Sequence, residues 1–591
     1  MCNGNHERAG LESDAEAVSS RPDGLSEEGS ARRNFLGRIG KWGSALAVFG
    51  LAADPTMQAL FSRSAFAAAQ AAGIFSPVGT GGNLPPIPAD QNPPPPPVPT
   101  GTIYWVATNG NDNNNGSEGS PFATVKRAYD QCGSGDGIYV RAGFFAQPSF
   151  TWTKPNIILR GAPGTTREQV VVERAGGGGG SGRLISFRGN TVNGSDPGVE
   201  NVHLYGITLQ AGPTPPGWVE EQAPKGSASD DWKVNNWRNE CLELLGRVRN
   251  CSFINCDIRH YYYRGFFISS LSSQFSGTDY THNSEIAYCN IHWAGFDTAG
   301  ADVSVSSNTG FVHVHHCELH GQSDGVVIVG CKRGSLVEYN HIYNQTREDG
   351  VDMKHTNSDN PLLPSGHRTI IRNNIIHNCA QQAIAIQRGA NRVDVYDNYI
   401  YDNGYGRIDR APTFDNPAIW VNAAWTNISS GTGGETRDAR IFNNTVYNTI
   451  GSGIQMSLAE ASGYPRDIEI KDNILYNNRK HGLRVLVGQE LAITGNIFSE
   501  NNSTRNKTQY QNSRASRSDV VSDNNTAYLP DSTYLWGEDS SRTYTLGEWQ
   551  SAFNQDKNST TIHGRFEMRA PPAPPPNFTV TDAGCVRRAY T

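Results

Sequence analysis

The chain has 591 residues, a formal net charge of −7, 63 glycines and 32 prolines. Only 18% of its residues are charged, below the usual share of about 25%, and this composition excludes collagen and low-complexity proteins. A net negative charge argues against a nucleic-acid partner, because no basic excess is available to neutralise phosphates. Abundant Gly and Asn with little charge favour an exported, turn-rich β protein over a helical one.

The first hundred residues are predicted to direct export and then to act as a spacer. Ala31–Gly37 reads Ala-Arg-Arg-Asn-Phe-Leu-Gly, and with the apolar residues 42–53 it resembles a twin-arginine export signal. That apolar stretch is too short to span a bilayer, and Ala65–Ala67 fits a processing site. We expect a signal peptide at 1–67, a Pro-rich linker at 68–101, and a bacterial protein of the periplasm or medium without membrane contact after cleavage. A chance arginine pair is the alternative.

A short phrase with Asn between apolar residues recurs along the chain, for example at Val337–Ile342, Ile371–Ile376 and Ile470–Leu475. Successive copies lie 23 or more residues apart, which is typical of a coil with loops of variable length. The apolar residues alternate as in strands rather than helices. A coil of about 23 residues with three short strands predicts a parallel β-helix solenoid. The central position of the phrase is occupied by Cys256, Cys289, Cys317, Asn340, Asn374, Asn398, Asn444, Asn473 and Asn496.

Stacked Asn side chains at this position are expected to hydrogen-bond between coils that lie about 4.8 Å apart. The three cysteines at one end of the column are interpreted as small buried stackers. This interpretation is favoured over disulfides, and the nine cysteines of the mature chain cannot all pair. The sequence has no C-x-x-C motif, which excludes a zinc ribbon.

Both ends of the repeat region resemble those of right-handed β-helix proteins. Residues 102–143 include the strand-like Ile103–Val106, and a helix is expected near 121–131, with Ser120 as its cap and Pro121 in its first turn. Near the end, Tyr544–Gln550 and Asp582–Gly584 resemble the closing segments of that superfamily. The resemblance implies an all-β, right-handed parallel β-helix over 102–543, an N-terminal capping helix, and a closing segment at 544–591.

One face of the predicted solenoid concentrates charge. A second column carries small residues: Gly265, Gly300, Gly325, Gly350, Ala383, Ala418, Gly453 and Gly482. Residues one and three places after this column are apolar and are expected to face inward, so those two and four places after it face outward. Most outward positions carry no charge, except near the middle of the solenoid, where they include Asp352 and Lys354. The charged or polar residues around them are Asp324, Glu348, Asp349, His355, Gln387 and Arg388.

The carboxylates of this face predict a calcium site. Asp324 and Asp349 are expected about 5 Å apart on adjacent coils, where two negative charges repel by about 3 kcal/mol at an effective dielectric constant of 20. A cation bound by oxygen ligands would remove this repulsion, and Ca²⁺ suits several carboxylates. We expect Asp324, Glu348, Asp349 and Asp352 to bind Ca²⁺. A solvated acidic ridge is the alternative.

The same residues resemble the sites of two polysaccharide lyase families. Ser323–Gly325 followed by Glu348–Asp352 is similar to the calcium cluster of family-nine pectate lyases, although Glu348 stands where that family usually has Asp. The position of that family's catalytic lysine is occupied by Ala385. Lys354 followed by Arg388–Asn391 looks like the Lys and Arg pair of family-six lyases that act on alginate and dermatan, although Gln387 fills the direct equivalent of the arginine.

These resemblances imply Ca²⁺-assisted β-elimination on an acidic polysaccharide that contains uronic acid. Lys354 would be the base, His355 the alternative base, and Arg388 would neutralise the substrate carboxylate. Other contacts with the polysaccharide are expected from Arg264, Arg333, Gln387 and Trp420, in a monomeric enzyme. A structural ion pair for Lys354 and a turn position for Arg388 are the alternatives. A glycoside hydrolase, a C5-epimerase and a non-catalytic glycan-binding protein remain open.

A dense run of histidines lies outside this face: His313, His315, His316 and His320. Alternation places His313 and His315 on one face of a strand. Ordinary packing within the strand is favoured over a metal site.

Overall fold

The computed structural model describes residues 92–564 and 566, with gaps. The gaps are 176–181, 190–197, 213–239, 262, 271–282, 293–299, 307–308, 322, 332, 346, 355–367, 406–415, 423–435, 458–463, 503–507, 514–518, 530–535, 539–541 and 565. The predicted signal peptide, His355 and the motif Asp582–Gly584 therefore lie outside the described residues. All described residues belong to one compact unit, Ser76–Thr591.

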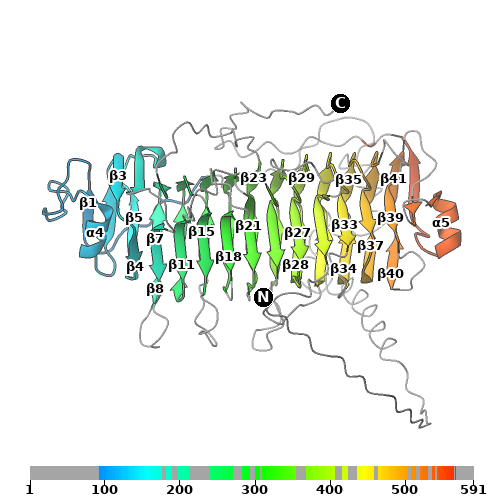
Figure 1. Ribbon diagram of the computed structural model, residues 1–591, viewed down its shortest axis with the longest axis horizontal. Coiled ribbons are helices and arrows are strands. Elements are labelled where there is room, and N and C mark those ends of the chain that lie inside the picture. The colour runs from blue at the N-terminus through cyan, green and yellow to red at the C-terminus, as the bar shows by residue number, and fades with distance from the viewer. Residues whose placement is uncertain are drawn as a thin grey trace, which may run out of the picture. The chain divides into compact units, whose positions relative to one another are not determined.

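The described strands form three 14-stranded sheets, and Figure 1 shows their strands side by side from the blue end of the unit to the red end. Sheet 1 contains β1 (Ile103–Val106), β2 (Gly137–Val140), β5 (Ile158–Gly161), β9 (His203–Tyr205), β13 (Ser252–Ile254), β16 (Ser284–Ala287), β19 (Val312–His315), β22 (Leu336–Glu338), β25 (Thr369–Arg372), β28 (Asn391–Tyr396), β31 (Arg437–Phe442), β34 (Arg466–Lys471), β37 (Gln489–Thr494) and β40 (Val520–Asp523).

Sheet 2 contains β3 (Gly143–Gln147), β6 (Val170–Arg174), β10 (Thr208–Gln210), β14 (Asp257–Arg259), β17 (Asn290–His292), β20 (Glu318–His320), β23 (His341–Tyr343), β26 (Ile375–His377), β29 (Tyr399–Tyr401), β32 (Thr445–Tyr447), β35 (Ile474–Tyr476), β38 (Ile497–Ser499), β41 (Thr526–Leu529) and β44 (Thr560–His563).

Sheet 3 contains β4 (Phe150–Trp152), β7 (Arg183–Arg188), β11 (Glu240–Leu245), β15 (Arg264–Ser269), β18 (Ala301–Ser306), β21 (Asp324–Val329), β24 (Val351–Lys354), β27 (Ile384–Gln387), β30 (Ile419–Asn422), β33 (Ile454–Ser457), β36 (Leu483–Val485), β39 (Tyr510–Asn512), β42 (Trp536–Gly537) and β43 (Thr543–Tyr544). β8 (Val199–Glu200) and β12 (Val248–Arg249) form a separate pair.

The predicted solenoid is confirmed. Neighbouring strands in each sheet are parallel, except that β42 and β43 are antiparallel. Along the middle of the unit each coil adds one strand to every sheet. The strands alternate as the sequence predicts: in β34, Ile468 and Ile470 are buried in the core, while Glu469 is only half-buried. Among the described residues, no helix has both the length and the hydropathy needed to cross a lipid bilayer.

The Asn ladder is confirmed between sheets 1 and 2. The Nδ2 of Asn340 donates to Oδ1 of Asn374 at 3.0 Å, and Asn374 donates to Asn398 at 3.0 Å. The residues before these three, Tyr339, Asn373 and Asp397, have φ between 54° and 56°. Asn and Asp adopt this left-handed conformation more easily than most residues. Each turn therefore consists of a left-handed residue followed by a buried ladder residue. The same hydrogen bonds continue through Asn444, Asn473, Asn496 and Asn525.

The cysteine column occupies the same place on earlier coils. The thiol of Cys317 donates to the carbonyl of Ile286 at 3.5 Å, just as the amide of Asn340 donates to the carbonyl of Val314 at 2.9 Å. All eight described cysteines are free and buried. The cysteines are therefore buried stackers, as predicted.

The first described helix begins later than predicted. α4 (Val125–Gln131) is capped by Thr124, whose Oγ1 accepts a hydrogen bond from the N–H of Arg127 at 3.1 Å. The expected cap, Ser120, lies outside the helix. The reason is Asp112, whose Oδ1 accepts the N–H groups of Ala123 and Thr124 and holds them outside the first turn. α4 contacts β1, β2 and β3 and buries Tyr129 at the N-terminal end of the sheets.

The motif expected near the C-terminal end forms α5 (Leu546–Phe553). Thr545 and Glu548 form a capping box, because each side chain accepts the other residue's backbone N–H. Trp549 is fully buried, and its indole N–H donates to Asp556 at 3.1 Å. A short 3₁₀ helix, η1 (Arg167–Gln169), precedes β6.

The column of small residues marks a bend in sheet 3. A Cβ on Gly325 would lie 2.7 Å from Cγ2 of Ile342 in the core, and the next residue, Val326, is also buried there. Two consecutive positions thus face inward and interrupt the alternation. The predicted register is wrong at Gly300, because the residue opposite Gly265 and Gly325 is Asp302. Asp302 fits there because its carboxyl group accepts hydrogen bonds from Tyr261 and Gln345 inside the coil.

Candidate functional site

Three aspartates meet on the outer face of sheet 3. Asp324 begins β21, Asp349 precedes β24, and Asp352 lies within β24. One carboxylate oxygen of each lies within 4.8 Å of the others. The residues are only 3%, 4% and 1% exposed. The bend at Gly325 and Gly350 creates this arrangement. Because two consecutive positions face inward there, the residue just before each glycine lies on the outer face together with the residue two places after that glycine.

Backbone amides hold two of the carboxylates in place. Asp324 Oδ1 accepts the N–H of Asp349 at 3.0 Å, and Asp349 Oδ1 accepts the N–H of Gln382 at 2.8 Å. The coil-to-coil repeat thus aims both side chains at the same point.

The electrostatics of the cluster are unfavourable. Burial raises the pKa of Asp324 well above its usual value, and the neighbouring charges of Glu348, Asp352 and Asp349 raise it further. The pKa of Asp349 is raised by burial first, and then by Asp352 and Glu348. Negative charge is therefore costly here without a compensating cation.

The lysine and the arginine that the sequence singled out lie beside this cluster. Lys354 forms an ion pair with Asp352 Oδ2, and Gln387 donates to Asp352 Oδ1 at 2.8 Å. Burial lowers the pKa of Lys354, but the charges of Asp352 and Asp324 outweigh it, so that the net pKa is raised; Arg388 acts in the opposite direction. Arg388 follows β27 in a left-handed turn with a φ of 53°.

The other predicted site residues lie farther from the three aspartates. Glu348 is close enough to raise the pKa values of Asp324 and Asp349 but is not a member of the three-carboxylate group. Arg264 lies two strands from Asp324, so about 10 Å away, with its guanidinium 3.9 Å from the ring centre of Tyr263 and bonded to Glu240.

The remaining two substrate-contact candidates lie on either side. Trp420 lies two strands from Asp352 through Ala385, and its indole N–H donates to Ser457 at 2.7 Å. Arg333 lies beyond the far end of β21, in the turn before β22. The structure therefore brings Lys354 and Gln387 to Asp352, and Arg388 close enough to act on Lys354, but it does not bring Arg264, Arg333 or Trp420 to the carboxylates.

The register confirms two details of the sequence alignment. Asp352 pairs with Ala385, so the place of the family-nine lysine has only a methyl group. Lys354 pairs with Gln387, so Arg388 is one residue beyond the direct equivalent of the family-six arginine. Lys354 and Arg388 are thus offset by one residue on adjacent strands.

The donor set of the three aspartates fits a calcium ion. Three buried carboxylates converge and offer oxygen atoms only, which is the chemistry that Ca²⁺ prefers. Asp324, Asp349 and Asp352 would therefore hold the ion, with Glu348 as an outer negative charge.

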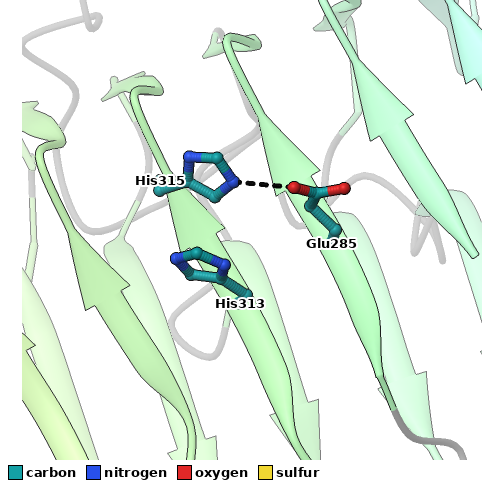
Figure 2. Close-up of side chains that lie close together, drawn as sticks. All are labelled: Glu285, His313 and His315. Atoms are coloured by element: carbon teal, nitrogen blue, oxygen red, sulfur yellow. Dashed lines mark hydrogen bonds and ion pairs between the residues drawn. The ribbon is translucent and has the colours of Figure 1, made fainter. Parts of the chain in front are cut away.

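A second group of ligand-type side chains lies on sheet 1. Glu285 in β16 and His313 and His315 in β19 also have ligand atoms within 4.8 Å of one another, and Figure 2 shows the His315 ring directed at Glu285, with the His313 ring beside that of His315. Sequence analysis found the two histidines but missed Glu285. A signal existed: Glu285 lies four residues before Cys289, just as His313 lies four residues before Cys317.

One family model matches part of the chain. Residues 241–429 match the family model described as "Right handed beta helix region". The A-module of the Azotobacter vinelandii mannuronan C-5 epimerase AlgE4 is 12% identical, with a TM-score of 0.38, covering 74% of this chain and 94% of that one. A Yersinia enterocolitica family 28 exopolygalacturonase is 12% identical, with a TM-score of 0.44 and coverage of 79% of each chain.

The pectate lyase Pel9A is also 12% identical, with a TM-score of 0.35, covering 68% of this chain and 80% of that one. No curated protein sequence matches the chain. At this level of identity the solved structures say nothing about which residues are catalytic. The family match and the three parallel sheets together make this chain a right-handed parallel β-helix protein.

Proposed function

We propose that the chain is a polysaccharide lyase that cleaves a uronic-acid-containing polysaccharide by Ca²⁺-assisted β-elimination. The observation that carries the proposal is the convergence of three buried aspartates beside Lys354, with Arg388 on the next coil. The predicted twin-arginine signal would place the enzyme in the periplasm or the medium, where such polymers are accessible.

The reaction requires removal of the proton on C5 of a uronic acid, next to its carboxylate. A bound Ca²⁺ would neutralise that carboxylate and make the proton more acidic. Arg388 would contribute a guanidinium for the same carboxylate, because its charge lies close enough to act on Lys354. The side chain of Gln387 is held by Asp352 and would border the same position.

Lys354 is the base of this mechanism. Its amine is protonated while it is paired with Asp352, because that ion pair raises its pKa. The amine accepts a proton only after it has lost Asp352 as its partner, and Arg388 then favours the neutral form. The ion pair with Asp352 is thus the resting arrangement of the proposed base.

The deciding experiment is an assay of the full chain against a panel of acidic polysaccharides. Unsaturated uronate ends absorb in the ultraviolet, so a lyase produces absorbance that grows with each cleavage. We expect absorbance with Ca²⁺ and none after complete chelation. New reducing ends without absorbance would contradict the lyase, and activity that survives chelation would contradict the role of calcium.

Matched variants test the residues. Lys354→Gln is expected to lower kcat by 10²-fold or more, the usual effect of losing a general base, while Ca²⁺ binding is kept. Lys471→Gln, a lysine on sheet 1, is the control and should leave kcat unchanged. Full activity in Lys354→Gln would eliminate Lys354 as the base.

Hydrolysis is a second candidate that one observation favours. The raised pKa values of Asp324 and Asp349 would suit a carboxylic acid that donates a proton to a leaving group. In that case reducing ends would form without ultraviolet absorbance, and Asp349→Asn would abolish activity with and without chelator.

A further inference from the structure

We propose that Glu285, His313 and His315 form a second metal site, on sheet 1, which binds a divalent transition metal of the Zn²⁺ type. The site is separate from the three aspartates, which lie on sheet 3, and does not depend on the proposed lyase activity. Two imidazoles and one carboxylate are a ligand set for zinc rather than for calcium, which takes oxygen ligands.

The strand register brings the ligands together. Glu285 in β16 pairs directly with His313 in β19, and His315 lies two residues further along the same face. The His315 Nε2 and the Glu285 Oε1 are 3.0 Å apart. Two ligands of a tetrahedral zinc ion with bonds of about 2.0–2.1 Å lie about 3.3 Å apart. The ion would therefore fit between them with little movement.

The second nitrogen of each imidazole is already held by another group. His313 Nε2 lies 2.9 Å from Glu338 Oε1, which leaves Nδ1 of His313 for the metal. His315 Nδ1 lies 2.8 Å from His316 Nδ1, which leaves Nε2 of His315 on the side of Glu285. Such outer hydrogen bonds fix the tautomer and orientation of metal-binding histidines.

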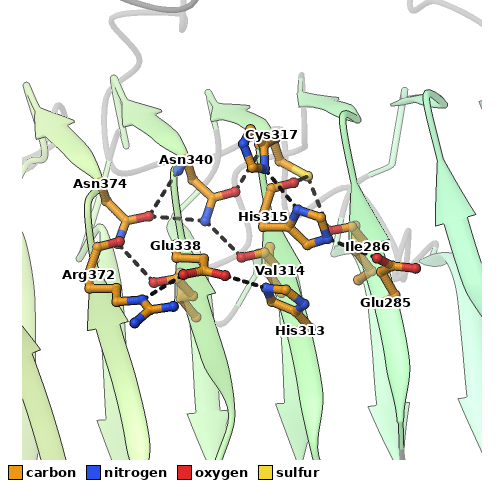
Figure 3. A network of polar contacts seen from close by, with 12 residues as sticks. Glu285, Ile286, His313, Val314, His315, Cys317, Glu338, Asn340, Arg372 and Asn374 are labelled. Atoms are coloured by element: carbon orange, nitrogen blue, oxygen red, sulfur yellow. Dashed lines mark hydrogen bonds and ion pairs between the residues drawn. The ribbon is translucent and has the colours of Figure 1, made fainter. Parts of the chain in front are cut away.

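These outer partners are themselves fixed, and Figure 3 shows Arg372 bonded to Glu338. Arg372 Nε donates to the second oxygen of Glu338 at 2.6 Å, and Arg372 also donates to the hydroxyl of Tyr396 at 2.9 Å. His316 lies between the rings of Tyr288 and Tyr339, at centre-to-centre distances of 4.8 and 5.1 Å.

Most other described histidines have a different environment. His341 and His377, for example, bond to each other within a stack of rings on sheet 2 and have no carboxylate in their group. Glu285, by contrast, is 40% exposed at its side chain, so the cluster opens to solvent. Three protein ligands and access to solvent leave a coordination position for water or for a ligand from outside.

The test is zinc binding by the full, tag-free chain in saturating Ca²⁺, which occupies the carboxylates of sheet 3. Bound zinc is counted after dialysis, and Co²⁺ in place of zinc reports tetrahedral coordination by its visible absorption. We expect one bound zinc ion per chain, and we expect its affinity to fall when these ligands are substituted. Glu285→Gln keeps the size and the hydrogen-bond acceptor, and should weaken binding at least tenfold.

Glu469→Gln is the matched control, because Glu469 lies in the same outward row of sheet 1 on β34. It should bind zinc as the unmodified chain does. The double variant His313→Gln/His315→Gln should lose the zinc and the cobalt spectrum, and the Glu285→Gln result decides the matter if the double variant does not fold. No retained zinc in the unmodified chain, or unchanged affinity in Glu285→Gln, would overturn the proposal.

Discussion

Asp349→Asn is expected to stabilise the calcium-free protein while removing its response to calcium. The carboxylates of Asp324, Asp349 and Asp352 lie within 4.8 Å of one another. At that distance and a dielectric constant of 20, each ionised pair repels by about 3.5 kcal/mol. The substitution removes this repulsion but keeps an oxygen that accepts the N–H of Gln382.

Proton uptake limits the size of the effect. Asp349 can take up a proton instead of remaining charged, and from an ordinary pKa of 3.8 this costs about 4 kcal/mol at pH 7. Because Asp349 takes part in two such pairs, proton uptake sets the limit, and the gain in the free energy of unfolding is expected to reach but not exceed about 4 kcal/mol. The sign follows from the raised pKa: the calcium-free protein loses stability as the pH rises above 3.8 through the folded-state value.

The assay is thermal unfolding with and without calcium at pH 7. Calcium at 100 times its dissociation constant should stabilise the unmodified chain by about 2.7 kcal/mol and Asp349→Asn hardly at all. Glu118→Gln, which removes an exposed carboxylate, is the control and should change stability by less than about 0.5 kcal/mol. A calcium-free Asp349→Asn protein that melts below the unmodified chain would refute the repulsion. An equal calcium response in both would refute the site.

Three further predictions concern the ladder, the ring stack and the proposed substrate face. Asn398→Ala removes the oxygen that accepts the N–H of Asn374 and the amide that donates to the carbonyl of Ile371, and should lower the free energy of unfolding by about 1–3 kcal/mol. Burial holds the pKa of His377 at about 3, below its usual 6.5, so the free energy of unfolding should fall as the pH drops below about 6.5. His377→Phe should reduce this loss, measured as the difference between thermal melts at pH 7 and pH 5. Trp420→Ala should lower kcat/KM for the acidic polysaccharide about tenfold in the absorbance assay, if its ring stacks on a sugar.

For each of these three predictions, one result would contradict it. Asn113→Ala, at an exposed turn, is the control for the ladder; equal denaturation midpoints for the two Asn variants would mean that the ladder adds no stability. An unchanged pH dependence in His377→Phe would show that another group, such as His341, governs it. An unchanged kcat/KM in Trp420→Ala would mean that the indole of the unmodified chain has only a structural role, through its hydrogen bond to Ser457.

Much of the fold follows from rules that repeat along the chain. A left-handed residue, often Asn or Asp, before a buried Asn or Cys recurs from coil to coil, as at Asn373 and Asn374, and it marks the turn between sheets 1 and 2. Since the same rule operates on every coil, the period, the strand alternation and the column of cysteines could be predicted from sequence alone. The concentration of Asp324, Asp349 and Asp352 against a background of little charge was equally visible.

Only the tertiary structure decided the details that depend on contacts between coils. Asp112 moves the start of α4 to Val125, and Asp302 takes the place expected for Gly300 because Tyr261 and Gln345 accommodate its carboxyl group. These contacts join residues far apart in the sequence, so no local pattern specifies them.

The candidate sites show the same division. The sequence supplied the aspartates and Lys354, but the bend at Gly325 placed Asp324 on the face of Asp352, and the fold paired Lys354 with Asp352. Glu285 lies one full coil before His313 and His315 in the chain. The three side chains meet only because β16 and β19 are neighbouring strands. The sequence alone therefore determined the repeat and the chemistry available on each face. The packing of one coil on the next decided which side chains meet.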